Sequence, residues 1–408
     1  MGRCRGRRRR QGRRGCFCCT ESDGRRGCSR CGSRGGKEMI RSNDILGIIQ
    51  SNAYDSCLAE LTNSRTMGSV PFGGRYRLID FTLSNMVNAG IGKVGVLTKS
   101  NYQSLMDHLG TGRPWDLSRK HGGMYLLPPF ATGESGKFNS RIEALKGNMH
   151  FISRCDEEYV LMSDCNVVMN FSVSDFAAFH EKSGADITVL CKHGKIPAIE
   201  GTLVFECRNG VVTSAMLGEA GEEGDYSVNI YFMKKALLER LINDAAAMKK
   251  KSFEEDIILA NIENLKICAM EHEGFAYAID SLAAYYEANM ALLEAENAHD
   301  LFTGKRPIYT KVRDDMPALY GIDSHAENSL VSDGCVIKGE VQNCILARGV
   351  TVEKGAVVKN SIIMQDGFIG AGAHVENVIF DKSVVLKPGK TLCGAEGFPV
   401  FVGKGIVI

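Results

Sequence analysis

The segment Ile369-Gly370-Ala371-Gly372-Ala373-His374-Val375 decides the fold of the C-terminal part of this 408-residue chain. Its first and last residues are apolar and stand six positions apart, and mostly small or turn-forming residues fill the gap. The same spacing recurs in the pairs Val331 and Ile337, Val352 and Val358, Ile363 and Ile369, and Ile379 and Val385. A six-residue apolar period is typical of a parallel β-helix, in which one residue of each hexapeptide points into the core. We therefore predict a hexapeptide β-helix over residues 325–408.

Residues 44–300 show a different pattern, in which short apolar runs alternate with amphipathic segments. The apolar runs predict buried strands at residues 45–49, 93–98, 158–162 and 187–191, and helical patterns lie at residues 80–89, 175–182 and 281–298. This alternation predicts a Rossmann-like α/β domain with a mostly parallel sheet. Ligands of such sheets bind beyond the carboxyl ends of the strands. Residues 301–324 are then a linker between the two domains.

The first 38 residues differ from the rest in charge. They hold 12 Arg and one Lys against three acids, a net of 13 − 3 = +10, so with a total of +1 the other residues carry 1 − 10 = −9. With almost no apolar content, this segment is expected to be a disordered basic extension, or one that arises from a start codon upstream of Met39. The spacing Cys28-x-x-Cys31 leaves a zinc site as the alternative. The acidic remainder argues against specific nucleic-acid binding.

Composition also indicates the cellular compartment. The nine cysteines beyond residue 38 stand singly in apolar contexts, which is typical of reduced thiols and predicts a cytoplasmic protein. No apolar run approaches the ~18 residues of a membrane span, so no membrane partner is expected. Cys57 and Cys165 are interpreted as ordinary thiols.

The most specific segment is Pro71-Phe72-Gly73-Gly74-Arg75-Tyr76-Arg77-Leu78-Ile79-Asp80-Phe81-Thr82-Leu83-Ser84-Asn85. It predicts a Gly-rich turn with two arginines that leads into the N-terminus of a helix. This arrangement suits a phosphate or an acidic partner. The alternative is a strand-turn-helix whose arginines pair with local acids.

This segment closely resembles the glucose-1-phosphate adenylyltransferases (ADP-glucose pyrophosphorylases) of bacterial glycogen synthesis. The resemblance extends over about residues 44–408 and includes Asn328–Ile337 at the entry to the β-helix. It implies a nucleotidyltransferase domain joined to a left-handed β-helix, and assembly as a tetramer. It also implies transfer of adenylyl from ATP to glucose 1-phosphate with release of pyrophosphate, which requires cations around the phosphates and carboxylates that hold Mg²⁺.

The groups that the resemblance assigns to catalysis are missing here. Family enzymes carry Gly-Gly-x-Gly-Thr-Arg-Leu after the first strand, a lysine before the Gly-Gly turn, a sugar-phosphate lysine and two metal-binding aspartates. The matching positions hold Asn52, Ala53, Asp55 and Cys57 in the loop, Met67 in place of the first lysine, and Ala278 in place of one aspartate. The second lysine should fall near Met216-Leu217-Gly218, and no lysine occurs between Lys195 and Lys234. Asp164 matches the other aspartate as a vestigial metal ligand that is not expected to hold metal, and Asp280 is a less favoured substitute for Ala278.

Three hypotheses follow. The first is a non-catalytic, regulatory subunit that forms a heteromer with a catalytic glucose-1-phosphate adenylyltransferase subunit; this chain alone then needs no cofactor, and Mg²⁺ serves the partner. The second is an active sugar-phosphate nucleotidyltransferase with an altered nucleotide loop. The third is a hexapeptide-repeat acyltransferase, which is weak because His374 is expected to be an isolated, solvated side chain.

The resemblance also implies a site for sugar-phosphate or nucleotide effectors between the two domains. The matching cations are Arg65, Arg77 and Lys382. Arginine suits this task because its planar fork binds phosphate oxygens in pairs. The alternative is that these cations form surface ion pairs of at most ~1 kcal/mol.

Overall fold

The computed structural model describes residues 40–129, 138 and 140–408. The expectations for residues 1–38, including the Cys28-x-x-Cys31 spacing, lie outside the described residues. The described residues belong to one compact unit.

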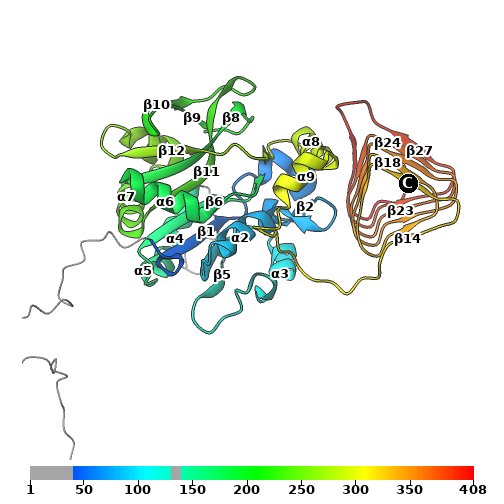
Figure 1. The fold of residues 1–408 in the computed structure, drawn as a ribbon, viewed down its shortest axis with the longest axis horizontal. Coiled ribbons are helices and arrows are strands. Elements are labelled where there is room, and N and C mark those ends of the chain that lie inside the picture. The colour runs from blue at the N-terminus through cyan, green and yellow to red at the C-terminus, as the bar shows by residue number, and fades with distance from the viewer. Residues whose placement is uncertain (1–39, 130–137, 139) are drawn as a thin grey trace, which may run out of the picture. The chain divides into compact units, whose positions relative to one another are not determined.

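A nine-stranded sheet forms the centre of the N-terminal part (Figure 1). Its strand order is β5 (Gly123–Leu127), β4 (Lys93–Leu97), β1 (Ile45–Gln50), β6 (Tyr159–Asp164), β11 (Glu223–Lys234), β8 (Ile187–Lys195), β12 (Ile267–Glu271), β10 (Val211–Leu217) and β9 (Leu203–Arg208). The strands from β5 to β6 are parallel, whereas β11 is antiparallel to both β6 and β8. The predicted α/β class and its four strands are confirmed, with an antiparallel strand inserted between β6 and β8.

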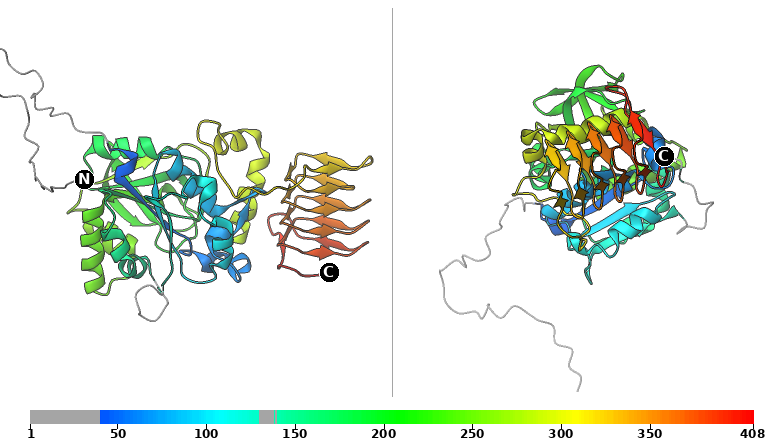
Figure 2. Two further views of the ribbon diagram at one scale, coloured as in Figure 1. Left: turned by 90° about the horizontal axis from the view of Figure 1, so that it is seen from below. Right: turned by 90° about the vertical axis from the view of Figure 1, so that its right-hand side faces the viewer.

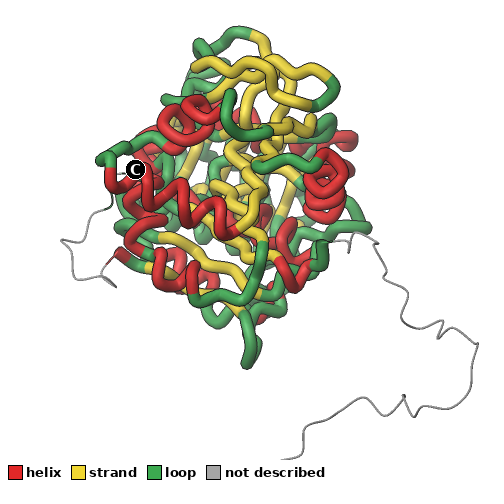
Figure 3. The backbone as a smooth tube through the Cα atoms, turned by 90° about the vertical axis from the view of Figure 1, so that its left-hand side faces the viewer, coloured by secondary structure: helices red, strands yellow, loops and turns green. Residues whose placement is uncertain are grey.

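The sheet is covered by helices on both faces, as Figure 3 shows. Alternate residues of β1 enter different cores, because successive side chains of a strand point to opposite faces. Ile45 and Ile49 pack in one core and Leu46 and Ile48 in the other. The first core includes α2 (Leu78–Asn88), α3 (Gln103–Leu109) and α6 (Val173–Ser183), and the second includes α4 (Arg141–Gly147), α5 (Met149–Ser153) and α7 (Lys235–Ala247).

The predicted helical stretch 281–298 is two helices, α8 (Leu282–Met290) and α9 (Ala295–Leu301), separated by a 3-10 turn, η8 (Ala291–Leu293). The side-chain amide of Asn297 donates to the carbonyl of Ala291, the first residue of this turn, at 3.1 Å. The remaining short elements are η1 (Ser42–Asp44), η2 (Asp55–Leu58), α1 (Ala59–Thr62), η3 (Met67–Ser69), β2 (Pro71–Phe72), β3 (Tyr76–Arg77), η4 (Arg113–Trp115), β7 (Val167–Met169), η6 (Glu254–Ile258), η7 (Leu259–Asn261) and β13 (Ala276–Ala278).

The C-terminal part is a left-handed β-helix with three parallel five-stranded sheets (Figures 1 and 2). The first sheet has β14 (Leu319–Tyr320), β17 (Val336–Ile337), β20 (Thr351–Val352), β23 (Phe368–Ile369) and β26 (Val385–Leu386). The second has β15 (His325–Glu327), β18 (Glu340–Gln342), β21 (Val357–Lys359), β24 (His374–Glu376) and β27 (Thr391–Cys393). The third has β16 (Leu330–Val331), β19 (Ile345–Leu346), β22 (Ile362–Ile363), β25 (Val378–Phe380) and β28 (Val400–Val402). Strand β14 lies within residues 301–324.

The six-residue period identifies most, but not all, of the β-helix core. Ile363, Ile369 and Val375 are fully buried in it, as predicted. The assignment of Ile379 and Val385 is wrong, because Phe380 and Leu386 occupy those core positions. A full coil is often 17 residues, as in the paired strands that hold Val341, Val358, Val375 and Leu392, so the apolar phase slips by one residue relative to three hexapeptides.

Ile379 instead packs in a third core, which joins the two parts of the chain. There, Ile345, Ile362 and Ile379 of the β-helix lie with Tyr285 and Leu292 of the α8 region. The β-helix is therefore buried against the N-terminal part through apolar side chains.

The structure bears on two further expectations, that the cysteines are reduced and that the chain has no membrane span. All nine cysteines in the described residues are free thiols; six are buried, Cys57 is half-buried, and Cys207 and Cys393 are exposed. Within the described ranges, no helix combines the length and apolar character that a membrane span requires.

Replacing Ile369 by Ala tests the β-helix core. Ile369 is 0% exposed, so its truncation leaves a cavity and is expected to lower the free energy of unfolding by about 2–5 kcal/mol. The matched control is Ile322→Ala, because Ile322 is 105% exposed and its loss is expected to cost less than about 0.5 kcal/mol. Urea denaturation measures both, and equal losses would contradict the assignment.

Candidate functional site

The turn after β1 lies at the carboxyl end of the parallel strands, where this fold class binds its ligands. In this turn, Asn52 is held by four hydrogen bonds, one of which its amide donates to the carbonyl of Ser100 at 3.2 Å. Its side-chain oxygen accepts from the backbone N–H of Lys99 at 2.9 Å and from the hydroxyl of Ser51 at 3.0 Å, and its amide donates to Asp55 at 2.5 Å. The polar groups of Asn52 are therefore directed into the protein's own loop.

Asp55 closes the same loop. Its second carboxylate oxygen accepts from the backbone N–H of Met67 at 2.8 Å, and burial raises the pKa of this carboxyl above its usual range. Ala53 is exposed and Cys57 is half-buried beside them. A phosphate cradle needs backbone N–H groups that are free to bind anions. Here the carboxylate of Asp55 accepts from the backbone N–H of Met67 in the way that a phosphate oxygen would.

Asp164 ends the neighbouring strand β6 and is paired with an arginine. The guanidinium of Arg141 lies 2.5 Å from Asp164 and 3.2 Å from Glu254, and stacks near the rings of Tyr231 (5.7 Å) and Phe253 (5.4 Å). The side chains of Arg141 and Asp164 are 9% and 2% exposed. Burial raises the pKa of Asp164 to about 6, although Arg141 opposes that shift. The fixed cation beside this carboxylate is thus Arg141.

The second metal position lacks a suitable donor. Ala278 ends β13 and has no ligand atom in its side chain. The carboxylate of Asp280 accepts from the backbone N–H of Ala198 at 2.6 Å and from the hydroxyl of Ser281 at 2.8 Å. Each oxygen of Asp280 therefore already accepts a hydrogen bond from the protein.

A cavity of about 180 Å³ remains next to this loop. Residues from the ends of β1 and β4, the start of α4 and two acidic side chains line it: Gln50, Asn52, Ala53, Tyr54, Leu97, Thr98, Lys99, Phe138, Ser140, Arg141, Ala144, Glu200 and Glu254.

A second cavity, of about 330 Å³, lies between the Gly-Gly turn and the β-helix and is strongly basic. Its lining includes six cations and a histidine and, among the described residues, no acid: Arg75, Arg77, His108, Lys311, Arg313, Arg348 and Lys382. Gly74 allows this close approach, since its φ is +81° and a Cβ there would lie 2.6 Å from the hydroxyl of Ser332. Asp315 and Asp333 compensate part of the charge, at 3.2 Å from Arg313 and 4.0 Å from Arg348.

Hydrogen bonds to neighbouring residues position two of the cations of this cavity, Arg77 and Lys311. Arg77 donates to the carbonyl and hydroxyl of Ser104 at 2.6 and 3.0 Å, and the amine of Lys311 donates to the carbonyl of Asp107 at 2.6 Å. Buried His108 contacts Asp80 at 2.6 Å, and Asp80 also accepts from the backbone N–H of Arg77 at 3.0 Å.

Burial, and after it the repulsion between like charges, lowers several pKa values here. Burial, with the neighbouring Arg77 and Arg65, lowers the pKa of Lys382 to about 7. Burial likewise lowers the pKa of Arg77 to about 10 and that of His108 below its usual value. An anion in this cavity would relieve these unfavourable interactions.

Arg65 does not lie at the surface. Its Nη2 bonds both carboxylate oxygens of Asp381, at 2.8 and 2.6 Å, and the two side chains are 3% and 4% exposed. Its Nη1 is buried and finds no hydrogen-bond partner within the described part of the chain. The interpretation of Arg65 as a surface ion pair is therefore wrong, because the pair is buried between the α/β domain and the β-helix.

Comparison with known proteins connects these features. The nucleotidyl transferase family matches residues 49–210, and the GlmU-like C-terminal hexapeptide family matches residues 318–396. The chain is 36% identical over 367 residues to the glycogen biosynthesis protein GlgD of Bacillus subtilis, covering 90% of this chain and 97% of that protein. It is 30% identical over 356 residues to the glucose-1-phosphate adenylyltransferase of Fervidobacterium nodosum, covering 85% of each.

The chain belongs to the glucose-1-phosphate adenylyltransferase family. It is also 32% identical over 326 residues to the Thermosipho africanus glucose-1-phosphate adenylyltransferase, covering 78% of each protein. The resemblance drawn from the Gly-Gly segment is thereby confirmed.

The structure brings most of the site residues predicted from the sequence together at two places. Asn52, Ala53, Asp55 and Met67 lie around one loop, joined by the bonds of Asn52 and Asp55. Arg77 and Lys382 line the basic cavity, and Arg65 lies beside it.

Sequence reasoning missed Arg141 and Glu254, which enclose Asp164, and the four further cations of the basic cavity. Only Arg75 carried a signal, as the other arginine of the Gly-Gly segment. No motif contains the other cations, because their place in the site depends on how distant segments pack. They are Arg141, Lys311, Arg313 and Arg348.

Replacing Arg65 by Ala tests the buried pair. The substitution leaves the carboxylate of Asp381 buried without its cation, so we expect the free energy of unfolding to fall by about 3–5 kcal/mol. The double variant Arg65→Ala/Asp381→Ala removes both charges and is expected to lose much less than the sum of the two single losses. Denaturant unfolding of all four proteins gives the coupling energy, and additive losses would count against the pair.

Proposed function

We propose that this chain is a non-catalytic, regulatory subunit that acts with a catalytic glucose-1-phosphate adenylyltransferase subunit in the synthesis of ADP-glucose for glycogen. The observation that carries this proposal is the Arg141–Asp164 ion pair, which lies where the family's reaction would need a metal ion. The likeness over 97% of the length of a glycogen biosynthesis protein supports the pathway.

The residues of the loop after β1 support the proposal that this chain does not catalyse adenylyl transfer. Adenylyl transfer develops charge on the departing pyrophosphate, which must be met by positioned donors and cations. In this chain, Asp55 places a carboxylate in the loop, where it accepts from the backbone N–H of Met67, and Cys57 stands where the resemblance expects an arginine. The chain thus needs no cofactor of its own, and Mg²⁺ is proposed to serve the partner's site.

The basic cavity supports a regulatory role. Six cations with partial compensation form a site for a multiply charged anion, and a sugar phosphate or nucleotide has this chemistry. The cavity is lined by both domains, so an anion bound there would draw the α/β domain and the β-helix together. We propose that this contact is how the subunit influences its catalytic partner in a heteromeric, tetrameric assembly.

The isolated chain is expected to form no measurable ADP-glucose from ATP, glucose 1-phosphate and Mg²⁺. Loss of a single oxyanion donor already costs ~3 kcal/mol, and several groups are absent here. The measurement is product formation by the pure chain, by a catalytic subunit alone, and by the two together. A change in rate or effector response only in the mixture supports the proposal, whereas robust turnover by the pure chain favours an active transferase with an altered loop.

Anion binding to the basic cavity is expected to weaken as the pH rises through about 7. Burial lowers the pKa of Lys382 to about 7, so its side chain is protonated below that value and loses its charge above it. Titration of the pure chain with sulfate, which does not itself titrate there, should give roughly tenfold weaker binding at pH 8.5 than at pH 6.

The variants Lys382→Ala and Lys390→Ala make this test specific. Lys390 is exposed on the same β-helix and does not line the cavity, so its replacement should leave the affinity and its pH dependence intact. Lys382→Ala should lower the affinity at pH 6 and remove the pH dependence. Equal behaviour of the two variants would contradict the assignment.

A further inference from the structure

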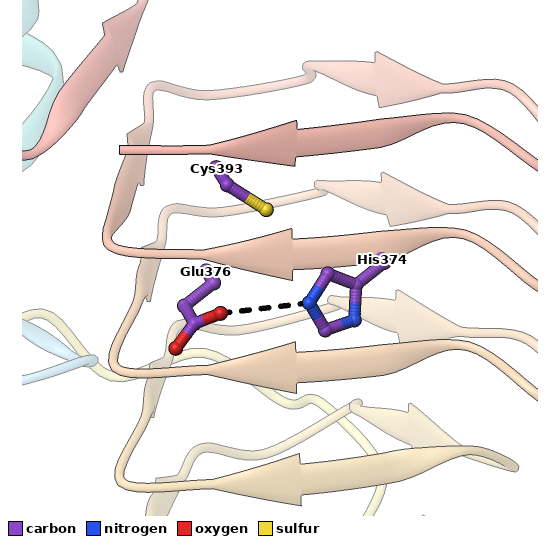
Figure 4. Close-up of side chains that lie close together, drawn as sticks. All are labelled: His374, Glu376 and Cys393. Atoms are coloured by element: carbon purple, nitrogen blue, oxygen red, sulfur yellow. Dashed lines mark ion pairs between the residues drawn. The ribbon is translucent and has the colours of Figure 1, made fainter. Parts of the chain in front are cut away.

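The outer face of one β-helix sheet carries three different metal-ligating side chains at one place. His374 and Glu376 are the first and third residues of β24, and Cys393 is the last residue of the adjacent strand β27. The residues between them, Val375 and Leu392, lie on the opposite side toward the core, so the three side chains share the outer face. Figure 4 shows them directed toward one another across the two strands.

The backbone ladder fixes this arrangement. Cys393 stands in register with Glu376, because β24 pairs with β27 in parallel. The potential ligand atoms of the three residues all lie within 4.8 Å of one another, and the imidazole Nε2 of His374 is 3.5 Å from the carboxylate of Glu376. Small rotations of side chains on a rigid sheet can therefore bring all three onto one ion.

The surroundings leave these ligands available. Cys393 is an exposed free thiol, and the side chains of His374 and Glu376 are each 38% exposed. Lys359, in register with Glu376 on the other side, instead lies 3.8 Å from Glu340. No cation of a neighbouring strand is thus committed to Glu376 among the ion pairs of the described residues.

We propose that His374, Glu376 and Cys393 bind one Zn²⁺ ion. An imidazole nitrogen, a carboxylate oxygen and a thiolate sulfur are the ligand types that zinc accepts, whereas Mg²⁺ and Ca²⁺ require oxygen ligands alone. Three protein ligands leave the fourth tetrahedral position to water. The ion would tie β27, the last strand of its sheet, to β24, so it would stabilise the final coil of the β-helix.

A second His and Glu pair on the same sheet can be compared with His374 and Glu376. His325 and Glu327 occupy the same positions on β15, with 3.7 Å between imidazole and carboxylate, but the adjacent strand β18 offers Gln342 in register with Glu327. A thiol therefore distinguishes the β24–β27 position from the β15–β18 position. Within the described residues, the first is the one group of three such ligands that reaches mutual ligand distance.

The test uses the full chain after removal of metal by a chelator, titrated with Co²⁺ as a spectroscopic substitute for Zn²⁺. Thiolate ligation of Co²⁺ gives an intense near-ultraviolet band. Because residues 1–38 carry further cysteines, the informative quantity is the difference between variants. Cys393→Ser should remove one equivalent of this band, while Cys207→Ser, at another exposed cysteine, should retain it.

Zinc affinity and stability give independent readouts. His374→Ala should weaken Zn²⁺ binding at the thiol-dependent site by at least roughly tenfold, the loss that even an outer partner of a zinc ligand produces, and His325→Ala should not. Zn²⁺ should raise the unfolding temperature of the unaltered chain and of Cys207→Ser but not of Cys393→Ser. An identical Co²⁺ spectrum and an identical thermal shift for Cys393→Ser and Cys207→Ser would overturn the proposal.

Discussion

A buried carboxylate at the end of a parallel strand requires a cation, and in this chain Arg141 supplies it to Asp164. In an enzyme that transfers adenylyl groups, the corresponding charge balance involves a metal ion that arrives and departs with the substrate. A guanidinium that is itself part of helix α4 is permanent, and it also contacts Glu254. The carboxylate can then be retained for stability after the catalytic need for it has gone, since removal of either partner would leave a buried, uncompensated charge.

Where the two domains meet, buried cations likewise require carboxylates, but here some of the cations lack one. Asp381 compensates Arg65 fully enough to bury it, but the neighbouring Arg77 and Lys382 have no comparable carboxylate within the lining of the basic cavity. Burial lowers the pKa of Lys382, and the neighbouring Arg77 and Arg65 lower it further. Arg141 thus faces two carboxylates, Asp164 and Glu254, whereas the lining of the interdomain cavity holds six cations and no acid, so of these two places the interdomain cavity is the one that favours an anion.

What the sequence predicts well is local. The strands β1, β4, β6 and β8, the helices α2 and α6 and the hexapeptide repeat each follow from a period within one segment. What it predicts poorly depends on residues far apart. The contact between Arg65 and Asp381 spans 316 positions, and the insertion of β11 between β6 and β8 leaves no mark in either neighbour. A six-residue period likewise cannot reveal that the coil length is often 17, so it assigns Val385 rather than Leu386 to the core.

The β-helix converts sequence distance into contact at a fixed interval, and this explains its place in the architecture. Its coils put Arg348 and Lys382 beside the Gly-Gly turn, and on the outer sheet they put Cys393 beside Glu376. Strand register sets the pair Glu376 and Cys393, whereas Arg348 and Lys382 stand in the turns that follow β19 and β25. The stacked coils on either side hold these turns, so the charge that the β-helix presents to the α/β domain is positioned before any ligand binds. A preformed cluster of like charges stores unfavourable energy that a bound anion releases. An anion bound at this cluster would contact cations from both domains, and its charge would offset the repulsion between them.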